Sequence, residues 1–125
     1  ALPGVRLVQV MHVLGPASVA EAVALAPLVE AILLDSGNPN LAVKELGGTG
    51  RTHDWATSRQ IVQAVPCPVY LAGGLNASNV AQAIAQVRPF GLDLCSSVRR
   101  DGRLHEGLLR GFFAAVREGD VALRR

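Results

Sequence analysis

Short apolar runs alternate four times with amphipathic segments along the chain. The apolar runs are rich in Val, Leu and Ile and are followed by polar or turn-forming residues, which is typical of β-strands. We expect strands at residues 5–13, 31–35, 68–72 and 91–95. The amphipathic segments have helical spacing, and we expect helices at residues 18–30, 55–65, 77–87 and 105–118. This order predicts four consecutive βα units and a parallel sheet.

The expected helices carry signals at their ends. Ser18 has the position of an N-cap, with a glutamate three residues later as in a capping box. Asp54 can cap the second helix, and Asn76 or Ser78 the third. Gly119 follows the last helix, and we expect it to end that helix.

Two architectures fit four βα units. The strands are apolar throughout rather than alternating, as expected for strands covered on both faces. A (β/α)₈ barrel has eight such units in about 250 residues, so four units in 125 residues correspond to a half-barrel. A flavodoxin-like open sheet is the alternative. Periodicity leaves both open.

The composition indicates one folded domain over residues 1–125. Half of the residues are hydrophobic and 18% are charged, a balance that argues against a disordered chain. The net charge is +2 and no basic run is interleaved with aromatic residues, so we expect no nucleic-acid partner. No apolar run reaches the roughly 18 residues of a membrane span, and we expect no membrane partner. Cys67 and Cys95 lack metal-ligand spacing, so we expect a reduced, cytoplasmic protein without metal.

Polar residues and glycines gather where each expected strand ends. In parallel βα proteins these ends share one face, and ligands bind there. The residues concerned are His12 and Gly15, then Asp35, Ser36 and Gly37, then Gly73, Gly74 and Asn76, and finally Cys95, Ser96 and Ser97. The sequence therefore predicts a functional site on this face.

The pair Gly73-Gly74 stands between an expected strand and an expected helix, in LAGGLNASNV. Glycine lets a ligand approach the backbone, and a helix N-terminus presents free N–H groups, so the pair suits an anion. A tight turn without ligand is the alternative. In (β/α)₈ barrels the loops after the last two strands often hold a phosphate. Ser96 and Ser97, at the next strand end, favour the phosphate.

Two aspartates belong to apolar runs. Asp35 ends AILLD and can be a general acid if its surroundings keep it protonated. An Asx turn that opens a loop is the alternative. Asp93 lies within GLDLC, either as a buried second carboxylate or, as we favour, in a structural hydrogen-bonding role. We interpret His12 as a packed or hydrogen-bonded residue rather than a base.

Several motifs in register resemble a known enzyme family. LLDS, GGTGRTHDW, PVYLAGGLNASNVAQAI and VRPFGLDLCSSV, in this order and spacing, are similar to the C-terminal half of phosphoribosylanthranilate isomerase. The resemblance implies strands 5 to 8 of a (β/α)₈ TIM barrel. It also implies an Amadori rearrangement of a phosphorylated sugar, the phosphoribosylamine of anthranilate, in tryptophan biosynthesis, without metal or cofactor. A relative of thiamine phosphate synthase would not explain LLDS followed by GGTGRTHDW.

The resemblance implies roles by position. Asp35 matches the general acid that protonates the ribose ring oxygen. The positions that match the phosphate-binding loops are Gly73, Gly74, Asn76, Ser96 and Ser97. The supporting positions are Asp93, inside the last strand, and Gly47, Gly48 and Gly50 of the GGTG segment, which closes over the substrate.

Some positions depart from the family pattern. The family's general base is a Cys at the end of the first barrel strand, which has no counterpart here, so we expect the isolated chain to be nearly inactive. Ser97 replaces a common Gly, where a Cβ crowds the backbone that phosphate approaches. Arg99 replaces an acidic residue, His53 an aromatic one, and His105 an Asp before the last helix. The departures indicate a divergent member; a non-catalytic phosphate-ligand binding or assembly domain with the same fold is the alternative.

A half-barrel has two open edges. Its first and last strands leave backbone groups unpaired and apolar faces exposed. Unless the chain is a fragment of a longer polypeptide, we expect it to self-associate or to meet a complementary N-terminal half-barrel.

Overall fold

The computed structural model describes residues 4–35, 51–94 and 96–124. Within them one parallel sheet contains four strands: β1 (Val8–His12), β2 (Ala31–Asp35), β3 (Val69–Ala72) and β4 (Gly91–Leu92). The strands lie in chain order, and one continuous row across the sheet consists of Met11, Leu34, Leu71 and Leu92. The predicted parallel α/β sheet is confirmed. Its strand order, in the described residues, lacks the reversal of a flavodoxin-like sheet.

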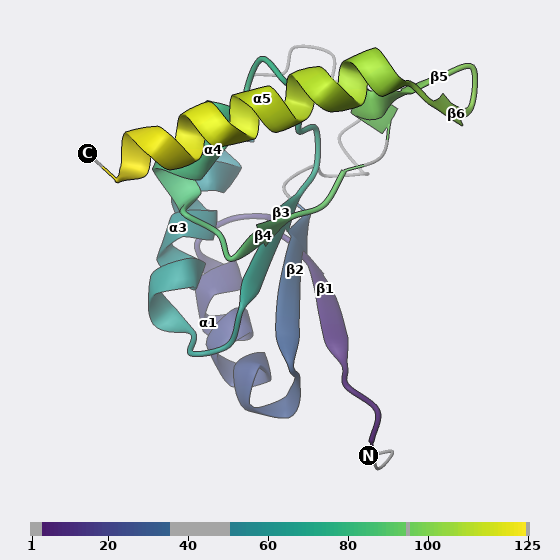
Figure 1. The fold of residues 1–125 in the computed structure, drawn as a ribbon. Coiled ribbons are helices and arrows are strands. Elements are labelled where there is room, and N and C mark those ends of the chain that lie inside the picture. The colour runs from purple at the N-terminus through teal and green to yellow at the C-terminus, as the bar shows by residue number, and fades with distance from the viewer. Residues whose placement is uncertain (1–3, 36–50, 95, 125) are drawn as a thin grey trace.

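A helix lies in each connection between consecutive strands, as parallel pairing requires. The helical elements are α1 (Ala17–Leu25), the 3₁₀ turn η1 (Ala26–Leu28), α3 (Arg51–Ala64), α4 (Val80–Val87) and α5 (Glu106–Leu123). They pack in the order α1, α3, α4, α5, and α1 and α3 lie on one side of the sheet (Figure 1). None of the helices in the described residues is long and apolar enough to cross a membrane.

The core lies between the sheet and these helices. Ile32, Leu34 and Leu71 of the strands are fully buried, as are Ile61 of α3 and Val80 of α4. Each apolar side chain of this size contributes about 1.5–3 kcal/mol when it is removed from water. This packed face fixes the strands, and therefore the positions of the loops that follow them.

The opposite face of the sheet remains open in the described structure. Val8 and Val10 of β1 are 54% and 49% exposed, whereas Met11, on the helix side, is 3% exposed. Val10, Leu33 and Tyr70 are register partners and share the open face. The prediction that both faces are covered is therefore wrong for the described residues. The continuous apolar runs reflect one packed face and one apolar face without cover.

Several element ends differ from the sequence prediction. α1 begins one residue before Ser18, whose hydroxyl accepts a hydrogen bond from Leu14 N–H (3.2 Å) instead of capping the helix. α3 begins at Arg51, ahead of the expected cap Asp54. β4 consists of Gly91–Leu92 alone. The residue pattern identified the four strands of the parallel sheet and the four α-helices, but not their exact ends. It did not predict β5 (Arg99–Arg100) and β6 (Arg103–Leu104).

An imidazole caps the last helix. His105 Nδ1 accepts a hydrogen bond from Leu108 N–H (3.1 Å), so histidine fills the capping position where the resemblance has an aspartate. Before this cap, β5 (Arg99–Arg100) and β6 (Arg103–Leu104) form an antiparallel hairpin. Asp101 and Gly102 make its turn with φ angles of 51° and 74°.

Gly119 brings α5 close to α4. The helix continues through Gly119 to Leu123, so the prediction that this glycine ends it is wrong. A Cβ at Gly119 would lie 3.0 Å from Ile84 Cδ1 and 3.1 Å from the Cα of Ala81. Glycine is therefore needed here for close helix packing rather than for a helix stop.

Alanine at Gly119 and at Gly111 is expected to change stability in opposite directions. Gly111 is exposed on the same helix and a Cβ there meets nothing within 4 Å, so Gly111→Ala should stabilise by about 0.5–1 kcal/mol. Gly119→Ala forces a methyl group against α4 and should cost about 1–3 kcal/mol. Thermal unfolding followed by circular dichroism measures both changes. A stability gain in Gly119→Ala would contradict the close packing.

Candidate functional site

The C-terminal ends of β2, β3 and β4 surround a cavity of about 390 Å³. It is lined by Asp35, Ala72, Gly73, Gly74, Leu75, Asn76, Asp93, Leu94 and Ser97. Six of these are predicted site residues, and they come from three different strand ends. The structure thus brings them together, because the carboxyl ends of adjacent parallel strands share one edge.

Asp35 lies beside His12, the last residue of β1. The two are partners in the parallel ladder, and His12 Nδ1 lies 3.7 Å from Asp35 Oδ2. Their side chains are 47% and 34% exposed, so both reach solvent, and Asp35 also lines the cavity. Of the two roles expected for His12, the packed one is wrong, because its imidazole is exposed. The approach to Asp35 is compatible with the other one, a polar contact, and the expectation that His12 is not a base stays a prediction.

Asp93 contributes a second carboxylate to the cavity. Its backbone N–H donates to Leu71 O (2.9 Å) and so extends the pairing of β3 with β4 by one residue. The side chain is exposed, so the alternative of a buried second carboxylate is wrong. β4 is an edge strand in the described sheet, which explains the exposure.

Gly73 and Gly74 form the turn between β3 and α4. Their φ angles are 94° and 69°, a region that residues with a Cβ rarely adopt. Both residues also line the cavity. The tight turn and the anion site are therefore compatible, since the same backbone serves for both.

Asn79 holds this turn in place, although it is not among the residues predicted from the sequence. Its Nδ2 donates to Gly74 O (2.9 Å), and its Oδ1 accepts from Asn76 N–H (2.9 Å). α4 begins at Val80 rather than at residue 77, so Asn79 is its N-cap residue. An Asn directly before an amphipathic run is the signal that could have identified it.

The side chain of Asn76 is engaged within the same loop. Its Oδ1 accepts hydrogen bonds from the backbone N–H of Ser78 (2.9 Å) and of Asn79 (3.1 Å), and from the Ser78 hydroxyl (2.6 Å). This is the arrangement of an Asx turn. The geometry assigns the Asn76 oxygen to shaping the loop.

Asn79→Ala is expected to loosen the glycine turn. The substitution removes two hydrogen bonds, each with a net contribution of about 0.5–1.5 kcal/mol to the free energy of unfolding. Gln82→Ala, at an exposed position of α4, is the control and should stay within about 0.5 kcal/mol of the parent protein. Chemical denaturation measures all three proteins. Equal stability of Asn79→Ala and the parent would show that Asn79 does not hold the turn.

Ser97 belongs to the 3₁₀ turn η2 (Ser96–Val98), which follows β4. Its Oγ is buried and has no hydrogen-bond partner among the described residues, and the residue lines the cavity. A buried hydroxyl without a partner is costly unless a ligand or water binds it. The side chain that we expected to crowd an anion thus brings an unpaired hydroxyl to the site.

Some predicted features lie outside the described residues. These are Cys95, the GGTG segment with Gly47, Gly48 and Gly50, and the side chains of His53 and Ser96. In the part of the chain that is described, no group of three His, Cys, Asp or Glu side chains could hold a metal ion.

Sequence comparisons relate the chain to one group of enzymes. The family model described as N-(5'phosphoribosyl)anthranilate (PRA) isomerase matches residues 3–115. The N-(5'-phosphoribosyl)anthranilate isomerase of Methanocella arvoryzae is 42% identical over 117 residues, which cover 93% of this chain and 53% of the relative. That of Haloferax volcanii is 43% identical over 111 residues, or 88% of this chain and 48% of the relative. The chain therefore spans about half the length of the curated relatives it matches.

Solved structures give the same relationship. The phosphoribosyl anthranilate isomerase of Thermococcus kodakaraensis has a TM-score of 0.69 at 36% identity, over 91% of this chain and 53% of that structure. The isomerase of Pyrococcus furiosus has a TM-score of 0.66 at 26% identity, over 93% of this chain and 52% of that structure. Nearly all of the described sheet and helices thus has a counterpart in about half of each isomerase.

Proposed function

The chain belongs to the N-(5'-phosphoribosyl)anthranilate isomerase family, as its motifs predicted, and we propose that it supplies the second half of such an enzyme. In this proposal residues 1–125 form strands 5 to 8 of a (β/α)₈ barrel in the cytoplasm. Four parallel strands in chain order support it, as does a match to about half of each isomerase structure. A second half-barrel supplies the other four strands.

The proposed reaction is the Amadori rearrangement of the phosphoribosylamine of anthranilate in tryptophan biosynthesis. A general acid protonates the ribose ring oxygen, and the ring C–O bond breaks as the amine nitrogen forms a Schiff base. A base then removes the proton from the adjacent carbon, which gives an enolamine. Tautomerisation yields the open-chain 1-deoxyribulose phosphate. One proton is donated and one is removed, so this scheme uses no metal, redox cofactor or second substrate.

Asp35 is the proposed general acid. It stands at the end of β2, at the cavity and in contact with solvent. After it donates its proton to the ring oxygen, it must be protonated again before the next turnover. His12, 3.7 Å away and also exposed, lies close enough to take part in that return through a water molecule.

The loops after β3 and β4 are the proposed phosphate site. The observation that carries the proposal is that one cavity joins Asp35 to Gly73, Gly74 and Ser97. Backbone N–H groups of a glycine turn and a buried hydroxyl are donors that an anion requires. We also assign Ser96 to this site, because its position matches the phosphate-binding loops of the family.

The remaining predicted residues support this site. In the proposal Asp93 keeps a supporting role at the cavity, and Asn76 holds the loop in shape. By resemblance the GGTG segment, with Gly47, Gly48 and Gly50, closes over the substrate. These three roles concern the binding and positioning of the substrate rather than the proton transfers.

The general base is proposed to lie in the other half-barrel. The isolated chain then has the acid and the phosphate site but lacks the base, so we expect it to be nearly inactive. A phosphate-binding domain without catalysis is the alternative. The location of Asp35 in the same cavity as the phosphate loops favours the isomerase, because binding alone does not need that carboxylate.

Co-production with the N-terminal half of the Methanocella arvoryzae isomerase tests the proposal. That relative is 42% identical to the chain over the matched residues, so the two halves should be compatible. We expect isomerase activity from the purified pair and almost none from either half alone. A folded pair that co-purifies but shows no activity would support the binding domain instead.

A further inference from the structure

The cavity at the strand ends has a negatively charged lining. Asp35 and Asp93 both belong to it, and no Lys, Arg or His side chain is among the described residues around it. The phosphate group of a sugar phosphate carries about 1.5–2 negative charges at neutral pH. The two carboxylates oppose the approach of such a group. The side chains of the lining therefore do not supply the positive charge that would draw a phosphate in.

The β5–β6 hairpin, directly after the cavity residue Ser97, is rich in arginine. Arg99, Arg100 and Arg103 are exposed there, and with one aspartate in the turn they give the hairpin a formal net charge of +2. A chain spans at most about 3.6 Å per residue, so the Cα of Arg100 lies within about 11 Å of the Cα of Ser97. This is close to the screening length of about 10 Å at 0.1 M salt. The positive charge of the hairpin therefore acts at the cavity.

Arg100 and Arg103 lie opposite each other in the hairpin. They are register partners in its antiparallel ladder, and the side chains of such partners share one face. Neither guanidinium group forms an ion pair within the described part of the chain. Glu106, the first residue of α5, binds Arg110 instead (2.9 Å). Like charges directly opposite each other destabilise a hairpin, so the arrangement is unfavourable until an anion approaches.

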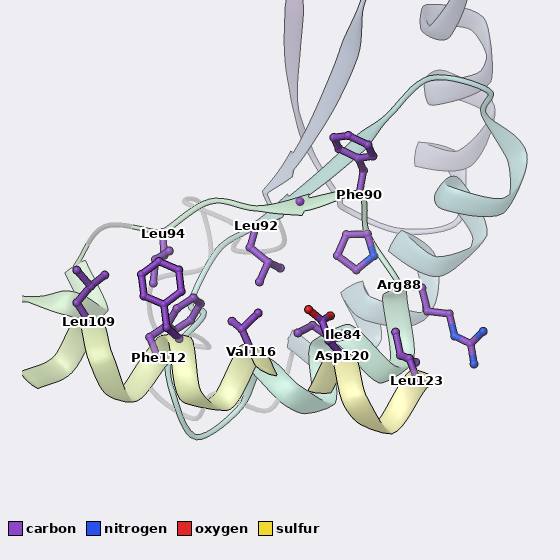
Figure 2. Close-up of a pocket in the computed structure, with 13 residues that line it drawn as sticks. Ile84, Arg88, Phe90, Leu92, Leu94, Leu109, Phe112, Val116, Asp120 and Leu123 are labelled. Carbon is purple, nitrogen blue, oxygen red and sulfur yellow. The ribbon is translucent and has the colours of Figure 1, made fainter. Parts of the chain in front are cut away.

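The hairpin is fixed relative to the site at its base. Val98, directly before it, is buried, and its carbonyl accepts a hydrogen bond from His105 N–H (2.7 Å), directly after it. α5 then packs against the segment that follows β4, and Figure 2 shows Leu94 of this segment facing Phe112 of α5. In Figure 1 the hairpin lies at the same end of the molecule as the C-terminal ends of the strands. Its charge is thus held beside the proposed phosphate loops.

We propose that Arg100 and Arg103 draw the phosphate group of the substrate, a phosphate monoester, to the loops at the ends of β3 and β4. This inference rests on the phosphate site in the proposed function. The field of the two arginines offsets the carboxylates of the cavity, and the backbone N–H groups of the loops then hold the phosphate. Such steering depends on charge and distance rather than on contact, so it weakens as the salt concentration rises.

Two double variants of the hairpin test the proposal by calorimetric titration of the chain with inorganic phosphate. Arg100→Gln with Arg103→Gln should raise the dissociation constant about threefold at about 0.1 M salt. Arg100→Glu with Arg103→Glu changes the charge by twice as much and should raise it about 10-fold. At about 1 M salt, where the screening length is about 3 Å, both variants should agree with the parent protein within about twofold.

Arg117→Gln with Arg124→Gln is the matched control, because it removes the same charge from exposed positions in and directly after α5. The helix leads away from the hairpin (Figure 1). Arg117 lies about 16 Å along it from Glu106, at about 1.5 Å per residue. The phosphate affinity of this control should stay within about twofold of the parent protein at both salt concentrations. Circular dichroism should give the same spectrum for all variants.

The possible failures of the proposal differ from one another. Equal phosphate affinity of the parent protein and the Arg100→Glu, Arg103→Glu variant at about 0.1 M salt would overturn the steering and leave the phosphate site in place. A loss of affinity that persists at about 1 M salt would also overturn it, because a screened field cannot cause such a loss. A parent protein that binds no phosphate would reject the phosphate site of the proposed function, and the steering with it.

Discussion

Asp35→Asn is expected to lower kcat/KM of the completed isomerase by about 10²–10⁴-fold, the usual contribution of a positioned general acid. The completed enzyme is the chain paired with the Methanocella arvoryzae half. Asparagine keeps the shape of the side chain but has no acidic proton for the ribose ring oxygen. The loss should fall mainly on kcat, because the phosphate loops still bind the substrate.

Asp101→Asn is the matched control for this substitution. Asp101 is exposed in the turn between β5 and β6 and has a φ angle of 51°, which asparagine adopts readily. Its activity should equal that of the parent pair. If Asp35→Asn were as active as Asp101→Asn, Asp35 could not be the general acid.

Gly74→Ala is expected to weaken the binding of inorganic phosphate about 10-fold, which corresponds to roughly 1.4 kcal/mol. Gly74 has a φ angle of 69°, where a Cβ costs about 1–2 kcal/mol, so the turn must shift to relieve the strain. That shift moves the backbone that the phosphate approaches. Isothermal titration calorimetry measures the dissociation constant directly.

Gly102→Ala controls for backbone strain alone. Gly102 has a similar φ angle of 74°, and a Cβ there would meet nothing within 4 Å. It lies in the hairpin rather than at the cavity. Both variants should lose similar stability, but only Gly74→Ala should lose phosphate affinity. Equal phosphate affinity in the two variants would show that the Gly73-Gly74 turn does not take part in phosphate binding.

The alternation of strands and helices could be predicted because apolar periodicity and turn residues are local signals. Gly119 shows the limit of such signals, since a glycine late in a helix looks the same whether it ends the helix or admits a neighbouring one. Only the position of α4 against α5 separates the two cases. The open face of the sheet could not be predicted from the sequence either. Apolar residues such as Val8 and Val10 have the same sequence pattern whether the sheet face that carries them is covered or exposed.

The candidate site was predictable as a set of strand ends, since parallel topology brings those ends to one edge. The contacts between residues within the site could not be predicted from the sequence. The approach of His12 to Asp35 depends on the register of β1 with β2, and the exposure of Asp93 depends on β4 being an edge strand. Asn79 was missed because two asparagines and a serine precede α4, and the sequence does not say which of them holds the turn.

Phosphate titration of the 125-residue chain, followed by backbone amide NMR, tests directly whether the loops at the ends of β3 and β4 bind phosphate. It needs neither the second half-barrel nor the substrate, and it reports on each loop separately. We expect saturable shifts at Gly73, Gly74, Ser96 and Ser97, with smaller changes at Asp35. Silence at these amides, or shifts confined to the arginines of the β5–β6 hairpin, would contradict a phosphate site at the ends of β3 and β4.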